Sequence, residues 1–413
     1  MRNKFISLFV LLLVSFLCKG QVSGLDSISQ GVEYPFINYE GDTLINVQHL
    51  APFYKKLLAL ENGDSVQVSI LHIGDSHIQA DFITREVRKN LQLRFGNAGR
   101  GLVFPLRVAG TNEPGDYRTS SNVGWQMAKV NSAGRFPEPG LSGISMLSSE
   151  GGAYIDITTS NHDDLDYAFD QVTLIHTKDS LQFDCRFTDS PPKFGYLMSA
   201  RPLEPGEIST SVQFQQPTNY VRIQAEQTET SQSSITINGV ILQNSLPGIL
   251  YHSVGINGAR YSDYNNSPQF FRQMKVLNPD LVIISMGTNE GANTKVTMEE
   301  VIAQVTSTVQ NIRAVNPAAC ILITTPTDDY LKKKYKNPYL EAVQRALLQS
   351  AAQQGVACWD LYSITGGFGS SSEWRKAALM QRDGVHFTKA GYMVQGDLLY
   401  KALIYGYQKY AAY

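Results

Sequence analysis

Four short motifs in this chain carry residue types that can perform nucleophilic catalysis. The first is Gly74-Asp75-Ser76-His77. A serine at a turn between a strand and a helix lies at the carboxyl end of a sheet, and its N–H lies near the positive end of the helix dipole, where a developing oxyanion is stabilised. The same turn also serves as an ordinary helix cap, so the motif requires partners elsewhere in the chain.

The second motif, Asp383-Gly384-Val385-His386, contains the groups that a serine nucleophile needs. A serine hydroxyl is a poor nucleophile until a base takes its proton, and an imidazole can do so near neutral pH. A carboxylate on the other ring nitrogen fixes the tautomer and stabilises the imidazolium. A spacing of three residues lets one loop deliver both groups, so we expect His386 to be the base and Asp383 its partner.

The two remaining motifs contain donors that could hold an oxyanion. Asn289 follows the apolar run 281–286 and could point its amide into the same crevice as Ser76. Gly258 follows a probable strand at 249–254, and a glycine lets a backbone N–H approach a substrate without a side chain in the way. Taken singly, Asn289 is an ordinary turn residue and Gly258 an ordinary hinge.

Alternating strands and helices position these motifs. Apolar runs at 66–73, 281–286, 320–325 and 356–361 predict buried strands, and helical spacing predicts helices at 83–95, 299–315, 339–353 and 389–405. Continuous apolar strands that alternate with helices are typical of a parallel sheet covered on both faces. Ligands of such α/β sheets bind at the carboxyl ends of the strands. Ser76, Gly258 and Asn289 follow predicted strands there, and the Asp383–His386 motif precedes the last helix.

Residues 105–248 have a different pattern. Runs such as 154–159, 171–176 and 220–225 alternate apolar and polar residues, and no convincing helix occurs among them. The run 234–242 contains Asn238-Gly239, which favours the type I′ turn of a β-hairpin. We therefore predict a β-sandwich inserted in one loop of a single α/β domain.

Composition sets the broad class. The 413 residues are 43% hydrophobic and 17% charged, which is typical of a globular protein. The formal net charge is −2, so bulk charge predicts no attraction to nucleic acid or to anionic membranes. The basic run Lys332–Lys336 is typical of a solvated turn, with contact to an acidic glycan as the alternative.

The N-terminus predicts export. Arg2 and Lys4 precede an apolar run at 5–17 that is short for a membrane span, and Gly20 follows as a small residue. We expect residues 1–20 to be a cleaved signal peptide, which places the mature protein in the periplasm or outside the cell without a stable membrane span. An uncleaved anchor is the alternative, and the bulky residues before Cys18 argue against lipid anchoring.

Three cysteines follow the signal, namely Cys185, Cys320 and Cys358. Their spacing does not fit a metal site, and Cys320 and Cys358 fall in apolar runs that look like neighbouring strands. Burial as small hydrophobic residues is the favoured interpretation, and a disulfide between these two is the alternative in an exported protein. The pattern does not decide between them.

Taken in order, Ser76, Gly258, Asn289 and His386 resemble the four blocks of the SGNH (GDSL-like) hydrolases. The resemblance implies a flavodoxin-like, three-layer α/β domain and Ser76 as nucleophile. It implies that Asp383 and His386 complete the triad and that the oxyanion hole combines the N–H groups of Ser76 and Gly258 with the Asn289 amide. His77 departs from the leucine of the commoner motif, which makes a lipase less expected. Neither a cofactor nor a metal is implied, so activity should survive chelators.

Three longer segments are similar to bacterial peptidoglycan O-acetylesterases, namely 73–81, 94–101 and 286–290. That family carries an inserted β-sandwich similar to carbohydrate-binding modules. The resemblance implies a hydrolase domain at 21–104 and 249–413, an insertion at 105–248, and an acetylated polysaccharide as substrate. The expected reaction removes an acetyl group from the C6 hydroxyl of N-acetylmuramic acid through an acetyl-enzyme.

Three other functions remain open. The enzyme could act on another acetylated polysaccharide, or it could transfer the acetyl group to a sugar hydroxyl instead of water. A non-catalytic glycan-binding protein is the third reading, and the presence of every triad residue disfavours it. Product analysis and labelling of Ser76 separate the three.

Overall fold

Uninterrupted apolar strands form the central sheet of the protein, as the sequence predicts. The structure is a computed structural model, and it describes residues 32–177, 179–190, 201–205 and 208–412. The predicted signal peptide lies outside the described residues. Residues 36–413 form one unit, which contains every candidate site residue.

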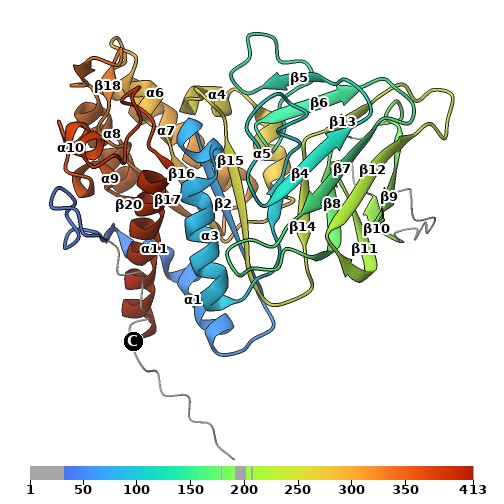
Figure 1. Cartoon of the computed structure of the whole chain (residues 1–413), viewed down its shortest axis with the longest axis horizontal. Helices are drawn as coiled ribbons and strands as arrows, with labels where there is room; N and C mark the ends of the chain where they lie inside the picture. Colours follow the sequence, from blue (N-terminus) through green and yellow to red (C-terminus); the bar gives the residue numbers. More distant parts are fainter. Residues whose placement is uncertain (1–31, 178, 191–200, 206–207, 413) are drawn as a thin grey trace, which may run out of the picture. The chain divides into compact units, whose positions relative to one another are not determined.

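The central sheet has six strands in the order β1-β20-β17-β16-β2-β15 (Figure 1). Its strands are β1 Leu44–Ile45, β2 Gln67–Gly74, β15 Gly248–Gly255, β16 Leu281–Ser285, β17 Cys320–Thr324 and β20 Ala357–Trp359. All neighbouring pairs are parallel except β1 with β20, which is antiparallel. The residues of β17 and β20 are all buried, which is the pattern of strands covered on both faces.

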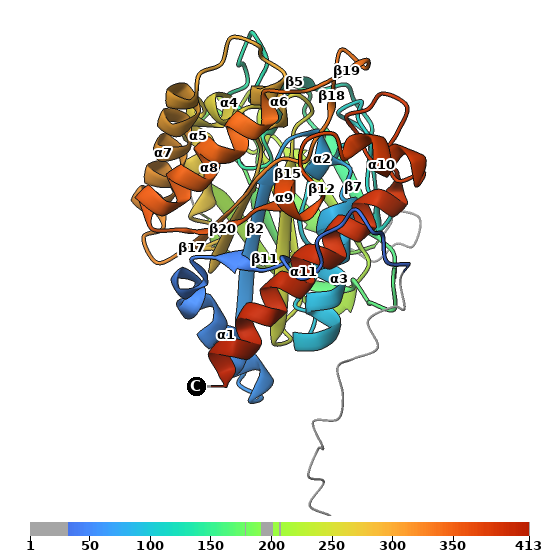
Figure 2. The ribbon, with the colours of Figure 1, turned by 90° about the vertical axis from the view of Figure 1, so that its left-hand side faces the viewer.

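Helices cover both faces of this sheet (Figure 2). One group is α1 Ala51–Glu61, α3 Phe82–Phe95 and α11 Lys389–Ala411, and the other is α4 Tyr261–Asn265, α5 Pro268–Met274, α7 Met298–Val315 and α8 Leu340–Gln354. Short helical turns are η1 Val47–Leu50, α2 Ser76–Gln79, α6 Thr288–Gly291, α9 Leu361–Ile364 and α10 Ser371–Lys376. The predicted helices are confirmed with small shifts at their ends. Helix α1, which begins with a proline in its first turn, was not predicted.

The segment between α3 and β15 consists of antiparallel sheets, as its alternating sequence predicts. A five-stranded sheet has the order β10-β11-β8-β14-β3, a four-stranded sheet β4-β7-β12-β9 and a three-stranded sheet β13-β6-β5. Their strands are β3 Gly101–Val103, β4 Tyr117–Ser121, β5 Gln126–Lys129, β6 Ile144–Ser148, β7 Tyr154–Thr159, β8 Phe169–Ile175, β9 Asp184–Thr188, β10 Arg201–Pro205, β11 Ser209–Thr218, β12 Tyr220–Glu226, β13 Ile235–Ile237 and β14 Gly239–Gln243.

One detail of the sequence prediction is wrong. The run 234–242 does form two strands, β13 and β14, but they belong to different sheets and not to one hairpin. β13 pairs with β6, whereas β14 pairs with β8 and with β3. Gly239 has the positive φ of +154° that the turn signal indicated, but Asn238 is fully buried, and its amide oxygen accepts the hydroxyl of Ser145 at 2.6 Å. The domain boundaries at 105 and 248 stay predictions.

A buried cluster of four charges ties α3 to the strands that follow it. Arg88 of α3 donates to both oxygens of Asp81 at 3.1 and 3.0 Å and to Asp116 at 2.9 Å. Arg100 lies 2.9 Å from Asp81 and 2.6 Å from Asp116. All four side chains are at most 4% exposed. The pKa of Asp81 lies below its usual value because the two guanidinium charges outweigh the effect of burial.

Cys185, Cys320 and Cys358 are free in the structure. Cys320 and Cys358 lie buried on adjacent strands, but Cys358 is opposite Ile323, so the favoured interpretation as buried small residues is confirmed. Among the described residues, we find no helix that combines the length and apolar character needed to cross a membrane.

Candidate active site

Ser76 begins helix α2 immediately after strand β2. Two opposed glycines make room for this turn, because a β-carbon on Gly74 would lie 2.2 Å from a carbon of Ile78 and one on Gly255 would lie 2.1 Å from the nitrogen of Gln79. The Asp75 carboxylate caps the helix by accepting the N–H of His77 at 2.9 Å. The chain therefore turns sharply at the carboxyl end of β2 and presents Ser76 there.

His386 and Asp383 occupy the loop between α10 and α11. The imidazole Nε2 of His386 lies 2.9 Å from the hydroxyl of Ser76, and its Nδ1 lies 2.7 Å from a carboxylate oxygen of Asp383. The other oxygen of Asp383 accepts the N–H groups of Val385 and His386, each at 3.0 Å. The structure thus brings together three side chains from segments 310 residues apart.

The hydrogen bonds of Asp383 favour its ionised form. Burial acts to raise the pKa of this carboxyl, but the hydrogen bonds from the His386 ring and from two backbone N–H groups outweigh it, so the pKa lies below its usual value. An ionised Asp383 accepts the Nδ1 proton of His386, which leaves Nε2 with a free lone pair toward Ser76. This is the protonation pattern that lets an imidazole take a hydroxyl proton.

The predicted oxyanion donors lie on either side of Ser76. They follow strands β15 and β16, the two neighbours of β2 in the sheet. Gly258 has φ of +78°, and a β-carbon there would meet only the Asn131 amide at 3.6 Å, so the conformation and not the space calls for glycine. The Asn289 amide donates to the carbonyl of Ala259 at 3.0 Å and to Asp75 at 3.2 Å, which fixes it between the two loops.

A cleft of about 580 Å³ opens over these residues. Its walls include Ser76, Gly258, Asn289 and His386, whereas Asp383 is not among them. The other residues that line the cleft are Gln79, Ala80, Phe82, Asn112, Asn257, Thr288, Gln381, Val385 and Tyr392. Every predicted nucleophile, base and donor therefore faces one space that is large enough for a sugar unit and its acyl group.

His77 lies behind the imidazole of His386 and not in the main cleft. Its ring centroid is 5.4 Å from that of His386, and its Nδ1 lies 3.0 Å from the hydroxyl of Tyr392. Burial and the neighbouring His386 lower the pKa of His77 to about 3, so its ring is neutral at neutral pH. The motif placed this histidine beside the nucleophile, but only the fold shows that it supports the back of the His386 ring.

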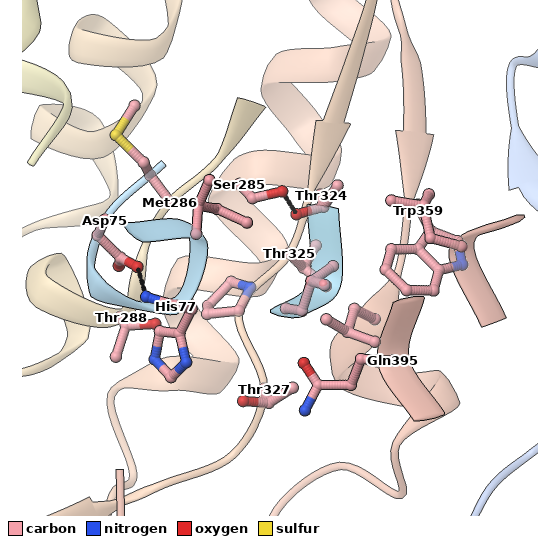
Figure 3. Close-up of a pocket in the computed structure, with 15 residues that line it drawn as sticks. Asp75, His77, Ser285, Met286, Thr288, Thr324, Thr325, Thr327, Trp359 and Gln395 are labelled. Carbon is pink, nitrogen blue, oxygen red and sulfur yellow. Dashed lines mark hydrogen bonds between the residues drawn. The ribbon is translucent and has the colours of Figure 1, made fainter. Parts of the chain in front are cut away.

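A second, smaller cavity of about 40 Å³ lies behind the turn that carries Ser76 (Figure 3). Asp75, His77 and Thr288 form one side of it, and Gln395 approaches from α11. Burial and the charge of Glu290 raise the pKa of Asp75 to about 7, against the lowering effect of the His77 N–H. Asp75 and Tyr392 could not be recognised from the sequence as parts of the site, because a helix-capping aspartate and a packed tyrosine are common residues without a catalytic motif of their own.

His72 and the tryptophans at 359 and 374 are structural. His72 is buried in β2 between the hydroxyls of Tyr251 at 2.7 Å and Ser285 at 2.6 Å. Trp359 and Trp374 are both 1% exposed, so neither can stack on a sugar. No group of three or more His, Cys, Asp or Glu side chains able to hold a metal ion occurs among the described residues.

The chain is similar to a known hydrolase family and to several solved structures. Residues 231–394 match the GDSL-like lipase/acylhydrolase family. A solved peptidoglycan O-acetylesterase superposes with a TM-score of 0.72 at 25% identity, over 91% of this chain and 98% of its own. A lipase/acylhydrolase from Enterococcus faecalis has a TM-score of 0.30 at 17% identity, over 38% of this chain and 75% of its own. A catalytic mutant of an acetylxylan esterase from Geobacillus stearothermophilus has a TM-score of 0.31 at 21% identity, over 39% of this chain and 73% of its own. No curated protein sequence matches the chain.

Proposed function

Because the chain belongs to the SGNH (GDSL-like) hydrolases and is a carboxylic ester hydrolase, we propose that it removes O-acetyl groups from peptidoglycan outside the cytoplasm. The bond cleaved is the acetyl ester on the C6 hydroxyl of N-acetylmuramic acid. One observation carries the proposal: the hydroxyl of Ser76 lies 2.9 Å from the ring nitrogen of His386 in an open cleft. The likeness to a peptidoglycan O-acetylesterase over nearly its whole length supports the choice of substrate.

In the proposed reaction, Ser76 attacks the acetyl carbonyl while its proton moves to Nε2 of His386. The negative oxygen that forms accepts hydrogen bonds from the N–H groups of Ser76 and Gly258 and from the Asn289 amide. The intermediate collapses as His386 returns its proton to the departing sugar oxygen, which leaves an acetyl-serine and a free sugar hydroxyl. Water then enters, gives a proton to His386 and releases acetate by the same route.

The reach of Asn289 depends on its present partners. Its amide is held by Asp75 and by the carbonyl of Ala259, so one of these bonds must lengthen when the amide turns to the oxyanion. The pKa of Asp75 is about 7, and protonation of that carboxyl weakens its hold on the amide. We therefore assign to Asp75 the positioning of Asn289 in addition to the cap of α2.

The antiparallel strands contribute to substrate binding in this proposal. We expect them to form a β-sandwich similar to carbohydrate-binding modules. One of their loops lines the cleft, and another contacts a residue of its wall. Asn112 lines it, and the Asn131 amide donates to the carbonyl of Asn257 at 2.9 Å, next to Gly258. A sugar in the cleft would therefore lie against both parts of the chain.

The test measures acetate released from O-acetylated peptidoglycan by the wild type and by Ser76→Ala. We expect release by the wild type and none above background from the variant, while the exposed control Ser120→Ala keeps full activity. Acetylated xylan assayed in parallel identifies the preferred polymer, and product analysis with an acceptor glycan detects transfer. Hydrolysis of p-nitrophenyl acetate without release from peptidoglycan would leave the esterase chemistry standing and reject the substrate.

A further inference from the structure

A basic hairpin stands beside the catalytic loops. Its strands are β18 Tyr330–Leu331 and β19 Tyr335–Lys336, and the lysines at 332, 333 and 334 form the turn between them. Residues 332–336 are all exposed. For Lys332 and Lys333 the structure records no ion pair with any described residue. We call residues 330–336 the lysine hairpin.

The backbone of this turn is unfavourable for lysine. Lys332 and Lys333 have φ of +51° and +62°, and the N–H of Lys334 donates to the carbonyl of Leu331 at 3.1 Å. Both central residues therefore have positive φ, as in a type I′ turn, in which asparagine and glycine are strongly preferred because a β-carbon is crowded at positive φ. Two lysines therefore occupy positions where folding alone would favour other residues, and an outlier of this kind points to a role outside the fold.

The lysine hairpin is anchored to both loops that carry site residues. The N–H of Tyr330 donates to the carbonyl of Gly384 at 2.8 Å, within the segment from Asp383 to His386. Just beyond the hairpin, the Asn337 amide donates to the carbonyl of Gly291 at 3.2 Å, at the end of α6, which contains Asn289. Figure 2 shows β18 and β19 at the same end of the sheet as α2 and α6.

The exposed side of this region is cationic although the whole chain carries a net charge of −2. The guanidinium of Arg375 lies 4.4 Å from the ring of Tyr330, and the exposed Arg382 precedes Asp383. Two carboxylates, Asp328 and Asp329, are buried at the base of the hairpin, where they accept hydrogen bonds from neighbouring groups. They do not cover the charges that face solvent.

We propose that the lysine hairpin binds carboxylates carried by the polymer whose acetyl ester lies in the cleft. This inference rests on the proposed function, because peptidoglycan bears anionic peptides next to its acetylated sugars. The ligand is the carboxylate of a peptide attached to the glycan, within reach of the hairpin while the sugar occupies the cleft. The hairpin thus distinguishes a peptide-bearing strand from a neutral acetylated polysaccharide.

Two variants separate charge from fold. Lys332→Gln with Lys333→Gln and Lys334→Gln removes three charges. Lys332→Asn with Lys333→Gly removes two and also supplies the residues that a type I′ turn prefers, so its melting temperature should rise. The matched control converts three exposed lysines away from the cleft to Gln. Lys55 lies in α1, Lys275 lies shortly before β16, and Lys409 lies near the end of α11.

The first readout is the ratio of kcat/KM on O-acetylated peptidoglycan to kcat/KM on p-nitrophenyl acetate. We expect the triple variant to lower this ratio about ten-fold at low salt, the range for a few exposed ion pairs, and the difference to vanish at about 0.5 M salt. The control triple variant should keep the wild-type ratio. A ratio equal to the wild type in both hairpin variants at low salt would overturn the proposal.

The second readout is independent of catalysis. Ser76→Ala protein is sedimented with intact sacculi and with glycan strands from which an amidase has removed the peptides. Adding the three Gln replacements at 332, 333 and 334 to this protein should weaken its binding to intact sacculi only. An equal loss of binding to both materials would assign the hairpin's ligand to the glycan or another wall polymer and reject the peptide carboxylate. Wild-type protein that binds sacculi through the hairpin but releases no acetate would reject the proposed function and leave the binding surface in place.

Discussion

Replacement of Arg88 by methionine should destabilise the protein more than any exposed change. The guanidinium is fully buried and bridges Asp81 and Asp116 at 2.9 to 3.1 Å. Its removal leaves two buried carboxylates with the single guanidinium of Arg100. Breaking a buried pair from one side costs about 3–5 kcal/mol, because the remaining charge is uncompensated. We expect a loss of that size in the free energy of unfolding at pH 7.5.

Urea unfolding followed by circular dichroism measures this loss. Arg88→Met combined with Asp116→Asn restores the balance of one carboxylate and one guanidinium, so it should recover about 2 kcal/mol relative to Arg88→Met alone. Asp116→Asn alone completes the double-mutant cycle. A loss below about 1 kcal/mol for Arg88→Met, or no recovery in the double variant, would refute the electrostatic explanation. The loss of unfolding free energy would then be attributed to packing of the arginine side chain alone.

The same cluster predicts a dependence on pH. Because the pKa of Asp81 in the folded protein lies below its usual value, its contribution to stability is complete above that usual value and is lost as the pH falls through the lower one. In Arg88→Met the stranded carboxylates can take up a proton at mildly acidic pH. The difference in unfolding free energy between wild type and variant should therefore shrink between pH 7 and pH 4.

Three further predictions concern the site and the core. Asn289→Ala should lower kcat by roughly 100- to 1,000-fold with little change in KM, as expected for loss of an oxyanion donor; a fall of less than about five-fold would exclude that role. Gly258→Ala should cost about 1 kcal/mol of stability in urea unfolding because its φ is +78°, and it should also reduce kcat. Burial raises the pKa of Asp42 to about 7, although the hydrogen bond from Trp359 acts to lower it. The folded state therefore binds the carboxyl proton of Asp42 more tightly than the unfolded state does, and stability falls as the pH rises from about 4 to 7. Asp42→Asn should therefore raise the melting temperature more at pH 8 than at pH 5, and an equal rise at both would contradict the assigned cause.

The sequence indicates which residues lie together at the site because local motifs contain the residue types that this chemistry needs. A serine after a strand, an Asp-x-x-His segment before the last helix, and a glycine and an asparagine after two other strands each fit an ordinary role. Only their order marked them as one set. The distances from Ser76 to His386 and from His386 to Asp383 now give that set a geometry. The catalytic role of each residue stays a prediction that the variants above test.

What the sequence missed depends on contacts made far along the chain. Asn238-Gly239 is a strong local signal for a hairpin turn, yet β13 and β14 do not pair with each other. β13 pairs with β6 in one sheet, and β14 pairs with β8 in another. The position of His77 behind His386 follows from the packing of α11, which brings Tyr392 to its ring. The sequence predicts a solvated turn at Lys332–Lys336, but the positive φ of Lys332 and Lys333 contradicts local preference, so propensity could not predict the type of that turn.

The register of the central sheet explains how the site tolerates a long segment between its parts. β2 and β15 pair as parallel neighbours over eight residues, with Gly74 opposite Gly255, so both strands end at the same level. β16 flanks β2 on its other side, with Ser285 also opposite Gly74. The nucleophile therefore follows the middle strand, and its two predicted partners in the oxyanion hole follow the strands on either side. The donors therefore reach Ser76 through the sheet and not through the long intervening chain.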